Sequence, residues 1–366
     1  MKKFWKLCKA WKLWQIVVPI CLVVASFLIL RLTRGYPWAA EFLFARGFYK
    51  YYAILWSSVT QWFPFSLMEL GIVLFPFLAV FLIVWVIVHR RNWKKYLLIC
   101  LWTVCIVFFW ITCTCNVNYN RYPFAVIGEL TVRDSSAEEL YQLCLRLSKE
   151  ANLLRAQLTK EDEDGAMQLM DPSIYQMSKT ARSSYRDLNE EYGVFNYRTA
   201  NTKPIFFSHL MSYTDLVGVY CPITMETNVN TDVADYSIPS TMCHELAHFF
   251  GFMREDEANF IGYLACIHSD SIEFRYSGTM LALIHAGNKL SEVDMDAYNQ
   301  LWQQYSEGLV RDLKQNSEYW KQFQQSTVRE VSTSINDAYL KANHQTDGVR
   351  SYGRMVDLLL AYYREE

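Results

Sequence analysis

Two histidines and a glutamate within the stretch Ser240–Cys266 have a spacing that suits hydrolytic chemistry. The stretch reads STMCHELAHFFGFMREDEANFIGYLAC, and His244, Glu245 and His248 form the pattern H-E-x-x-H in it. On a helix, side chains four residues apart point to nearly the same side, so both imidazoles can bind one metal ion. A zinc ion lowers the pKa of bound water to about 7, and a neighbouring carboxylate can accept the proton and pass it to a leaving group. The pattern therefore predicts a metal centre with Glu245 as general base and acid.

A catalytic zinc ion has three protein ligands and an open fourth position, so a third ligand is expected near the histidines. Gly251 is the expected left-handed end of the first helix. Acidic residues at positions 255–257 then open a second apolar-patterned segment. The sequence therefore predicts an antiparallel helix pair that brings acidic side chains close to His244 and His248.

The pattern HELAH followed by REDEANFIGYLAC resembles the gluzincin zinc peptidases. The similarity is to the E-x-x-A-D or E-x-x-A-N element of HtpX-like membrane peptidases and ImmA/IrrE-type proteins. The resemblance implies that Glu255 is the third zinc ligand and that Asn259 supports a ligand from behind. Only residues 249–254 separate the two motifs, fewer than in most gluzincins, so the turn must be tight and Glu257 is the alternative ligand. The layout also resembles a family of uncharacterised bacterial membrane proteins.

The motif has other interpretations. Gly251 falls where metzincins place a glycine, but Arg254 occupies their last ligand position and cannot bind zinc, which excludes that class. A zinc site kept only for binding would make the protein a non-catalytic membrane receptor or sensor. A chance H-E-x-x-H on an amphipathic helix would leave a membrane scaffold without metal.

A zinc hydrolase generally needs a hydrogen-bond donor that faces the developing oxyanion. Three side chains that follow the second helix in the sequence are the candidates for this role: His268, Arg275 and Tyr276. Sequence position does not say which way they point.

Short β-type runs between residues 203 and 230 predict a small antiparallel sheet. In gluzincin-like domains, an edge strand just before the metal helix binds the substrate backbone as an additional strand. The resemblance places Thr227–Asn230 in that position, with Asn228 and Asn230 as candidates to line the cleft.

Three charge-free runs in the first third of the chain are long enough to cross a bilayer: Leu13–Leu30, Leu70–Val88 and Tyr96–Cys115. The N-terminus and the loop around residues 89–95 are strongly basic, and short basic loops stay in the cytoplasm. The first run reads as an uncleaved anchor because no small-x-small cleavage site follows it. With three spans, everything after Cys115 lies outside the cytoplasm. The uncharged stretch Tyr51–Met68 is polar and rich in Trp and Tyr, which favours an interfacial helix over a fourth span.

Composition adds limits to these predictions. The net charge is −2, which gives no indication of a nucleic-acid partner. Ten cysteines without C-x-x-C spacing do not suggest a disulfide scaffold or a cysteine metal site. Cys243 and Cys266, which flank the motif, are expected to be buried apolar residues.

Together these observations predict a membrane region over residues 1–119 and a zinc metallopeptidase-like domain over residues 120–366. The second is expected to be an α+β, mostly helical gluzincin-like domain. The expected function is a multi-pass, membrane-anchored zinc peptidase of the cell membrane, with a polypeptide as substrate, the lipid bilayer as partner and the catalytic domain outside the cytoplasm. The sequence does not indicate an oligomeric state or a cleavage specificity.

Overall fold

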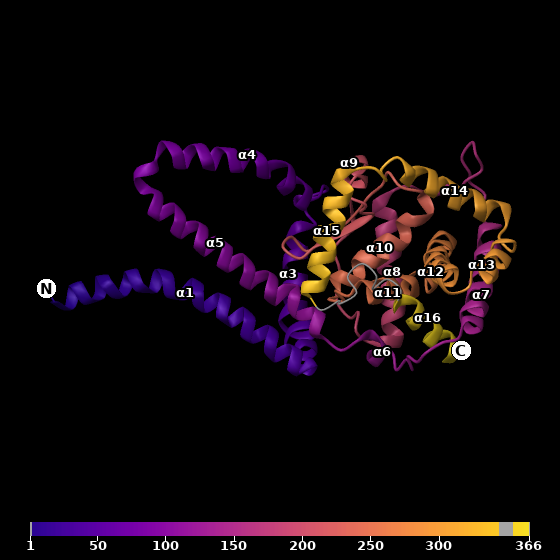
Figure 1. Cartoon of the computed structure of the whole chain (residues 1–366), viewed down its shortest axis with the longest axis horizontal. Helices are drawn as coiled ribbons and strands as arrows, with labels where there is room; N and C mark the ends of the chain where they lie inside the picture. Colours follow the sequence, from indigo (N-terminus) through magenta and orange to yellow (C-terminus); the bar gives the residue numbers. More distant parts are fainter. Residues whose placement is uncertain (1, 344–353, 366) are drawn as a thin grey trace. The chain divides into compact units, whose positions relative to one another are not determined.

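The computed structural model describes the backbone of residues 2–343 and 354–365 (Figure 1). The chain is mostly helical and forms two compact units. The first unit comprises Met1–Tyr52 and Leu67–Tyr122, and the second comprises Ala53–Ser66 and Pro123–Glu366. The main division between the units falls between Tyr122 and Pro123, and the segment 53–66 belongs to the second unit.

Three helical segments of the first unit are long and apolar enough to cross a membrane: Leu13–Gly35, Leu67–Val88 and Arg90–Asn120. The helices that carry these segments are α1 (Lys2–Gly35), α4 (Leu67–Val88) and α5 (Trp93–Thr114). Within the described residues no fourth helix qualifies, because the uncharged stretch around residue 55 forms only the short helix α3 (Lys50–Thr60). The prediction of three apolar helices long enough to span a membrane is confirmed.

A buried ion cluster holds the first unit together between its apolar helices. The short elements of this unit are α2 (Pro37–Ala39), η1 (Ala40–Tyr49), η2 (Arg90–Asn92), which joins α4 to α5, and η3 (Asn116–Asn120). The Glu41 carboxylate is fully buried and accepts two hydrogen bonds from Arg121, both of 2.9 Å, and one of 2.7 Å from Arg46. Because a buried charge is tolerated only when it is paired, this cluster fixes η1 against the segment that follows η3.

The second unit is a helical domain with one small sheet. Its helices are α6 (Phe124–Ile127), α7 (Ala137–Arg155), α8 (Ile174–Tyr192), α9 (Ser208–Ser212), η4 (Asp235–Ser237), α10 (Ile238–Phe249), α11 (Glu255–Ile267), α12 (Ile272–Val293), α13 (Met295–Trp302), α14 (Glu307–Lys321), α15 (Thr327–Ala342) and α16 (Arg354–Glu365). The sequence signals at helix ends act as expected. Ser136 and Glu139 form a reciprocal capping box that starts α7, and Gly251 has φ = 85° just after α10.

Three strands form a mixed sheet in the order β1-β3-β2. The strands are β1 (Lys203–Pro204), β2 (Gly218–Cys221) and β3 (Glu226–Val229). β2 and β3 form an antiparallel hairpin, but β1 runs parallel to β3, so the prediction of a wholly antiparallel sheet was wrong in this strand. The chain leaves β1 through α9 and returns on the far side of β3, which makes β3 the central strand.

The helices α10 and α11 lie in the interior of the second unit, where α8 and α12 pack on both of them and α16 packs on α11 (Figure 1). Nearly every residue of both helices is buried, including Cys243 and Cys266, which are free thiols as expected. The sheet packs on α10 through β2 and β3. The predicted metal motif is therefore at the centre of the domain, where its side chains are held by packing on several sides.

Candidate metal centre

A tight turn brings the start of α11 back against the middle of α10. Gly251, whose φ of 85° suits glycine, donates its N–H to His248 O at 2.9 Å. Phe252 N–H donates to Ala247 O at 3.1 Å, which completes the end of the helix. Three residues later Glu255 opens α11. The short connection that the sequence required is thus formed by a left-handed glycine cap.

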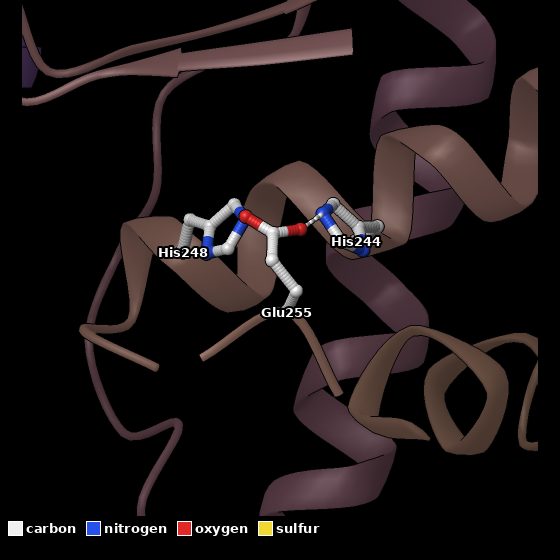
Figure 2. A group of neighbouring side chains, drawn as sticks. All are labelled: His244, His248 and Glu255. Atoms are coloured by element: carbon white, nitrogen blue, oxygen red, sulfur yellow. Dashed lines mark ion pairs between the residues drawn. The ribbon is translucent and has the colours of Figure 1, made fainter. Parts of the chain in front are cut away.

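Three side chains converge from this helix pair. His244, His248 and Glu255 each offer a ligand atom, and the three atoms lie within 4.8 Å of one another. Figure 2 shows the Glu255 carboxylate between the two imidazoles. One oxygen is 3.4 Å from His244 Nε2 and the other is 3.6 Å from His248 Nε2. Two imidazole nitrogens and a carboxylate at such separations are a donor set that zinc accepts.

The outer nitrogens of both histidines are fixed by hydrogen bonds. His248 Nδ1 lies 2.8 Å from Phe252 O, and because a carbonyl can only accept, this nitrogen carries the proton. His244 Nδ1 lies 2.8 Å from the side-chain oxygen of Asn259, which acts in the same way. In the neutral rings both Nε2 atoms therefore present lone pairs to the centre, as metal-binding histidines do. The resemblance implies that Asn259 supports a zinc ligand, and in the structure Asn259 contacts His244.

Electrostatics favours a cation between the three groups. Burial alone would raise the pKa of Glu255, yet His248 and His244 lower it below the usual value, so the side chain is an anion. Burial lowers the pKa of His248 to about 4, which leaves it neutral near pH 7. Burial also works against protonation of His244, but Glu255 holds its pKa above the usual value. A divalent cation can take the place of the proton that Glu255 favours on His244 Nε2.

Glu245 lies beside the triad with an unsatisfied oxygen. Its side chain is 4% exposed, and Oε2 has no hydrogen-bond partner in the described structure. Burial raises its pKa to about 8, partly offset by His244 and by a hydrogen bond from the Tyr220 backbone N–H. A buried carboxyl oxygen without a partner is costly in a purely structural role. The orphaned oxygen, the two oriented imidazoles and the anionic Glu255 together fit a metal-dependent centre.

Two glycines that the sequence analysis did not single out allow this arrangement. A Cβ atom at Gly218 of β2 would lie 2.4 Å from Glu245 Oε1. A Cβ atom at Gly262 of α11 would lie 3.0 Å from the backbone nitrogen of His244. Only glycine permits these close approaches, and neither position has a local sequence signal because the contact comes from a different element.

The alternative ligand Glu257 points elsewhere. Its Oε1 accepts hydrogen bonds from Phe124 N at 3.0 Å and from Arg254 at 2.8 Å. It follows Glu255 by two residues on a helix, which places it on a different side of α11. The structure therefore brings Glu255, not Glu257, to the histidines.

The predicted substrate strand needs correction. Asn228 and Asn230 are fully buried, and both belong to the central strand or its end. The Asn228 amide donates to Val219 O at 3.2 Å, and the Asn230 amide to Ser212 Oγ at 2.8 Å. Because β3 is flanked on both sides, neither residue can line a cleft at a sheet edge. The edge strand next to Glu245 is β2.

The three oxyanion candidates are engaged in other contacts. The Tyr276 hydroxyl donates to Asp312 at 2.5 Å. Arg275 lines a separate cavity of about 510 Å³ between α7 and α12. His268 Nε2 lies 3.1 Å from Glu191. These contacts give none of the three a role at the triad.

A further histidine was missed by sequence reasoning. His285 of α12 is half-buried, and its partial burial together with the charge of His244 lowers its pKa to about 4. A neutral imidazole near the triad is a suitable hydrogen-bond donor to an oxyanion. Its distance from the motif in sequence, with no recognisable pattern around it, explains why it was not predicted.

Comparison with known proteins identifies a family but no characterised relative. A family model described as "Protein of unknown function (DUF3810)" matches residues 44–360. Curated proteins and solved structures gave no match. Since the matched region covers most of the chain and contains the whole metal centre, the chain belongs to the DUF3810 family of proteins of unknown function.

Proposed function

We propose that the protein is a membrane-anchored zinc peptidase. The observation that carries the proposal is the convergence of His244, His248 and Glu255 beside Glu245, whose buried Oε2 has no partner. A site for binding alone needs only the three ligands. The fourth group, a buried carboxyl beside the three ligands, is what proton transfer in hydrolysis requires.

A zinc ion held by these three residues would supply Lewis-acid chemistry, activating water and polarising a peptide carbonyl. Glu245 is placed to accept the proton of the attacking water at Oε2 and to donate it to the leaving amine. The Tyr220 N–H and the packing of α10 orient this carboxyl. His285 can donate a hydrogen bond to the developing oxyanion.

The edge strand β2 is the proposed binding site for the substrate backbone. Asn230 N–H donates to Val217 O at 2.9 Å, so in this antiparallel pair the backbone groups of Val217 and Val219 face β3. Those of Gly218 and Tyr220 then face outward, towards Glu245. An extended peptide that pairs with this edge would pass beside the Glu245 carboxyl. Gly218, which has no side chain, leaves room for that carboxyl against β2.

The proposed location of the domain is outside the cytoplasm. Three helices long enough to span a membrane and a basic segment at His89–Lys95 between the second and third support it. The bilayer and a polypeptide substrate are the proposed partners.

The test compares purified wild-type chain with Glu245→Gln, which keeps the shape but cannot accept a proton. With zinc present, wild type should cleave members of a peptide library, and the variant should be slower by about 10²–10⁴-fold in kcat while holding the same amount of zinc. Asp256→Asn, on the next helix and outside the triad, serves as control and should retain activity. A second measurement compares the N-termini that proteolysis creates in cells that express wild type and in cells that express Glu245→Gln. If wild type holds zinc but cleaves no peptide, and both kinds of cell show the same N-termini, the protein is a zinc-binding receptor or sensor.

A further inference from the structure

A cavity in the second unit is lined by four cations and no carboxylate. Its volume is about 700 Å³, within the range of roughly 300–1,000 Å³ that is usual for small-molecule sites. Lys179, Arg182 and Arg186 come from α8 at spacings of three and four residues, so they share one side of the helix. Arg198 comes from the loop after α8. The cavity thus gathers about four positive charges from two segments.

Among the described residues these cations have no carboxylate partner, although three of them, Lys179, Arg186 and Arg198, are exposed and Lys179 lies over the Tyr175 ring. Arg155 and Lys203 each form a buried ion pair with a carboxylate. In the described part of the chain, none of the four cavity cations forms an ion pair. Arg182 Nε donates to the Ser178 carbonyl at 3.3 Å, and Arg186 to Ser183 Oγ at 3.0 Å. Burial lowers the pKa of Arg182, and the charges of Arg198 and Arg186 contribute to the same shift. The cluster is therefore held together against its own repulsion.

The floor of the cavity is a packed aromatic group. The Phe250 ring centroid lies 5.0 Å from that of Tyr185, 4.9 Å from Tyr197 and 5.2 Å from Phe195. The Tyr185 hydroxyl donates to Cys243 O at 2.6 Å, and the Tyr197 hydroxyl to Phe249 O at 3.1 Å. These bonds fix the floor to α10, so the cavity is formed before any ligand arrives.

The cavity is distinct from the metal centre. Phe250 follows Glu245 by five residues, which at about 100° per residue places them about 140° apart around the helix axis. Glu245 faces β2, whereas the floor of the cavity lies on the other side of α10 towards α8.

We propose that this cavity binds a small molecule or group that carries a doubly charged oxyanion, either a phosphate or a pair of carboxylates. Guanidinium groups donate pairs of hydrogen bonds to such oxyanions, and two negative charges would offset the repulsion within the cluster. The aromatic floor accommodates an apolar part of the ligand, since the cavity is larger than an inorganic phosphate.

The test is thermal unfolding of the full chain in detergent, with inorganic phosphate, succinate or sodium chloride at equal ionic strength. Phosphate, succinate or both should raise the Tm of wild type above the chloride value, and the responding anion identifies the oxyanion type. Arg182→Gln and Arg198→Gln should each weaken the affinity about tenfold or more, as expected for loss of a charge-assisted hydrogen bond. Lys179→Gln removes a further cation of the cavity. Lys321→Gln is its matched control, because Lys321 is an exposed cation on α14 outside the cavity. Only Lys179→Gln should reduce the response.

Two further readouts separate this site from a general salt effect and from the metal centre. At low salt without added anion, Arg198→Gln should unfold at or above the wild-type Tm, because it removes like-charge repulsion. His244→Ala should keep the full response to the anion. The proposal is overturned if neither anion exceeds chloride, if Lys179→Gln and Lys321→Gln respond equally, or if the response disappears in His244→Ala.

Discussion

At the scale of single residues, the centre depends on side chains that orient other side chains. His244 and His248 both offer Nε2 because each Nδ1–H donates to a carbonyl oxygen. For His244 this oxygen belongs to the Asn259 side-chain amide, and for His248 it is the backbone carbonyl of Phe252. Such outer partners fix the ring tautomer and raise the basicity of the ligand nitrogen. Of these two partners, only Asn259 can be removed by mutation, because the other is a backbone carbonyl.

Replacing Asn259 by Ala should weaken zinc binding by about 10–100-fold without unfolding the domain, because His244 loses its acceptor. Asn259→Asp keeps an acceptor oxygen and should retain affinity close to that of wild type. Competition with a chromogenic zinc chelator measures both. Equal affinity of wild type and Asn259→Ala would show that the hydrogen bond does not support the ligand.

Local spacing was sufficient to predict much of this centre. His244, Glu245 and His248 follow from one pattern, and Glu255 and Asn259 from a resemblance carried by the next few residues. Gly218, Gly262 and His285 were missed because each reaches the site through tertiary packing. The incorrect assignments have the same origin: Tyr276 and His268 are near in sequence, but their hydroxyl and ring nitrogen bind Asp312 and Glu191.

At the scale of elements, the centre requires α10 and α11 to approach closely. Gly262 provides this approach, since a Cβ there would lie 3.0 Å from His244 N and 3.2 Å from His244 Cα. Both are backbone atoms of a buried helix, so they cannot move aside as a flexible side chain would.

Gly262→Ala should therefore destabilise the domain by about 1–3 kcal/mol and weaken zinc binding, because it separates the helices that carry the ligands. The matched control is Gly287→Ala on α12, where a Cβ would be 3.6 Å from its nearest neighbour, an ordinary contact. That change should be neutral, or stabilising by up to about 1 kcal/mol through helix propensity. Thermal unfolding of both variants checks the pair; equal effects would mean that the close approach at Gly262 does not limit packing.

The sheet shows where sequence patterns stop being informative. Its strands are only two to four residues long, so alternation of side chains is too brief to give direction or order. The parallel pairing of β1 with β3 arises from the path through α9, which follows β1 after three residues. By contrast the helix pair α10 and α11 was predicted because caps and periodicity act locally.

At the scale of the whole molecule, the orientation in the membrane decides which polypeptides can reach the site. Three apolar helices and basic residues at His89–Lys95 support the proposal, under the positive-inside rule, that the second unit lies outside the cytoplasm. Alkaline phosphatase fused after Glu366 should therefore be active, whereas the same enzyme fused after Arg91 should be inactive. The reverse pattern would place the metal centre in the cytoplasm and change the proposed substrates accordingly.

The central claim is that one zinc ion is bound by His244, His248 and Glu255, and elemental analysis of the purified full chain tests it most directly. Wild type and Glu245→Gln should each contain about one zinc per chain, whereas His248→Ala and Glu255→Gln should lose most of it, with Glu257→Gln as the control that keeps it. The claim is contradicted if the wild-type chain, purified in the presence of zinc, holds no stoichiometric zinc. It is also contradicted if His248→Ala and Glu255→Gln hold as much zinc as wild type.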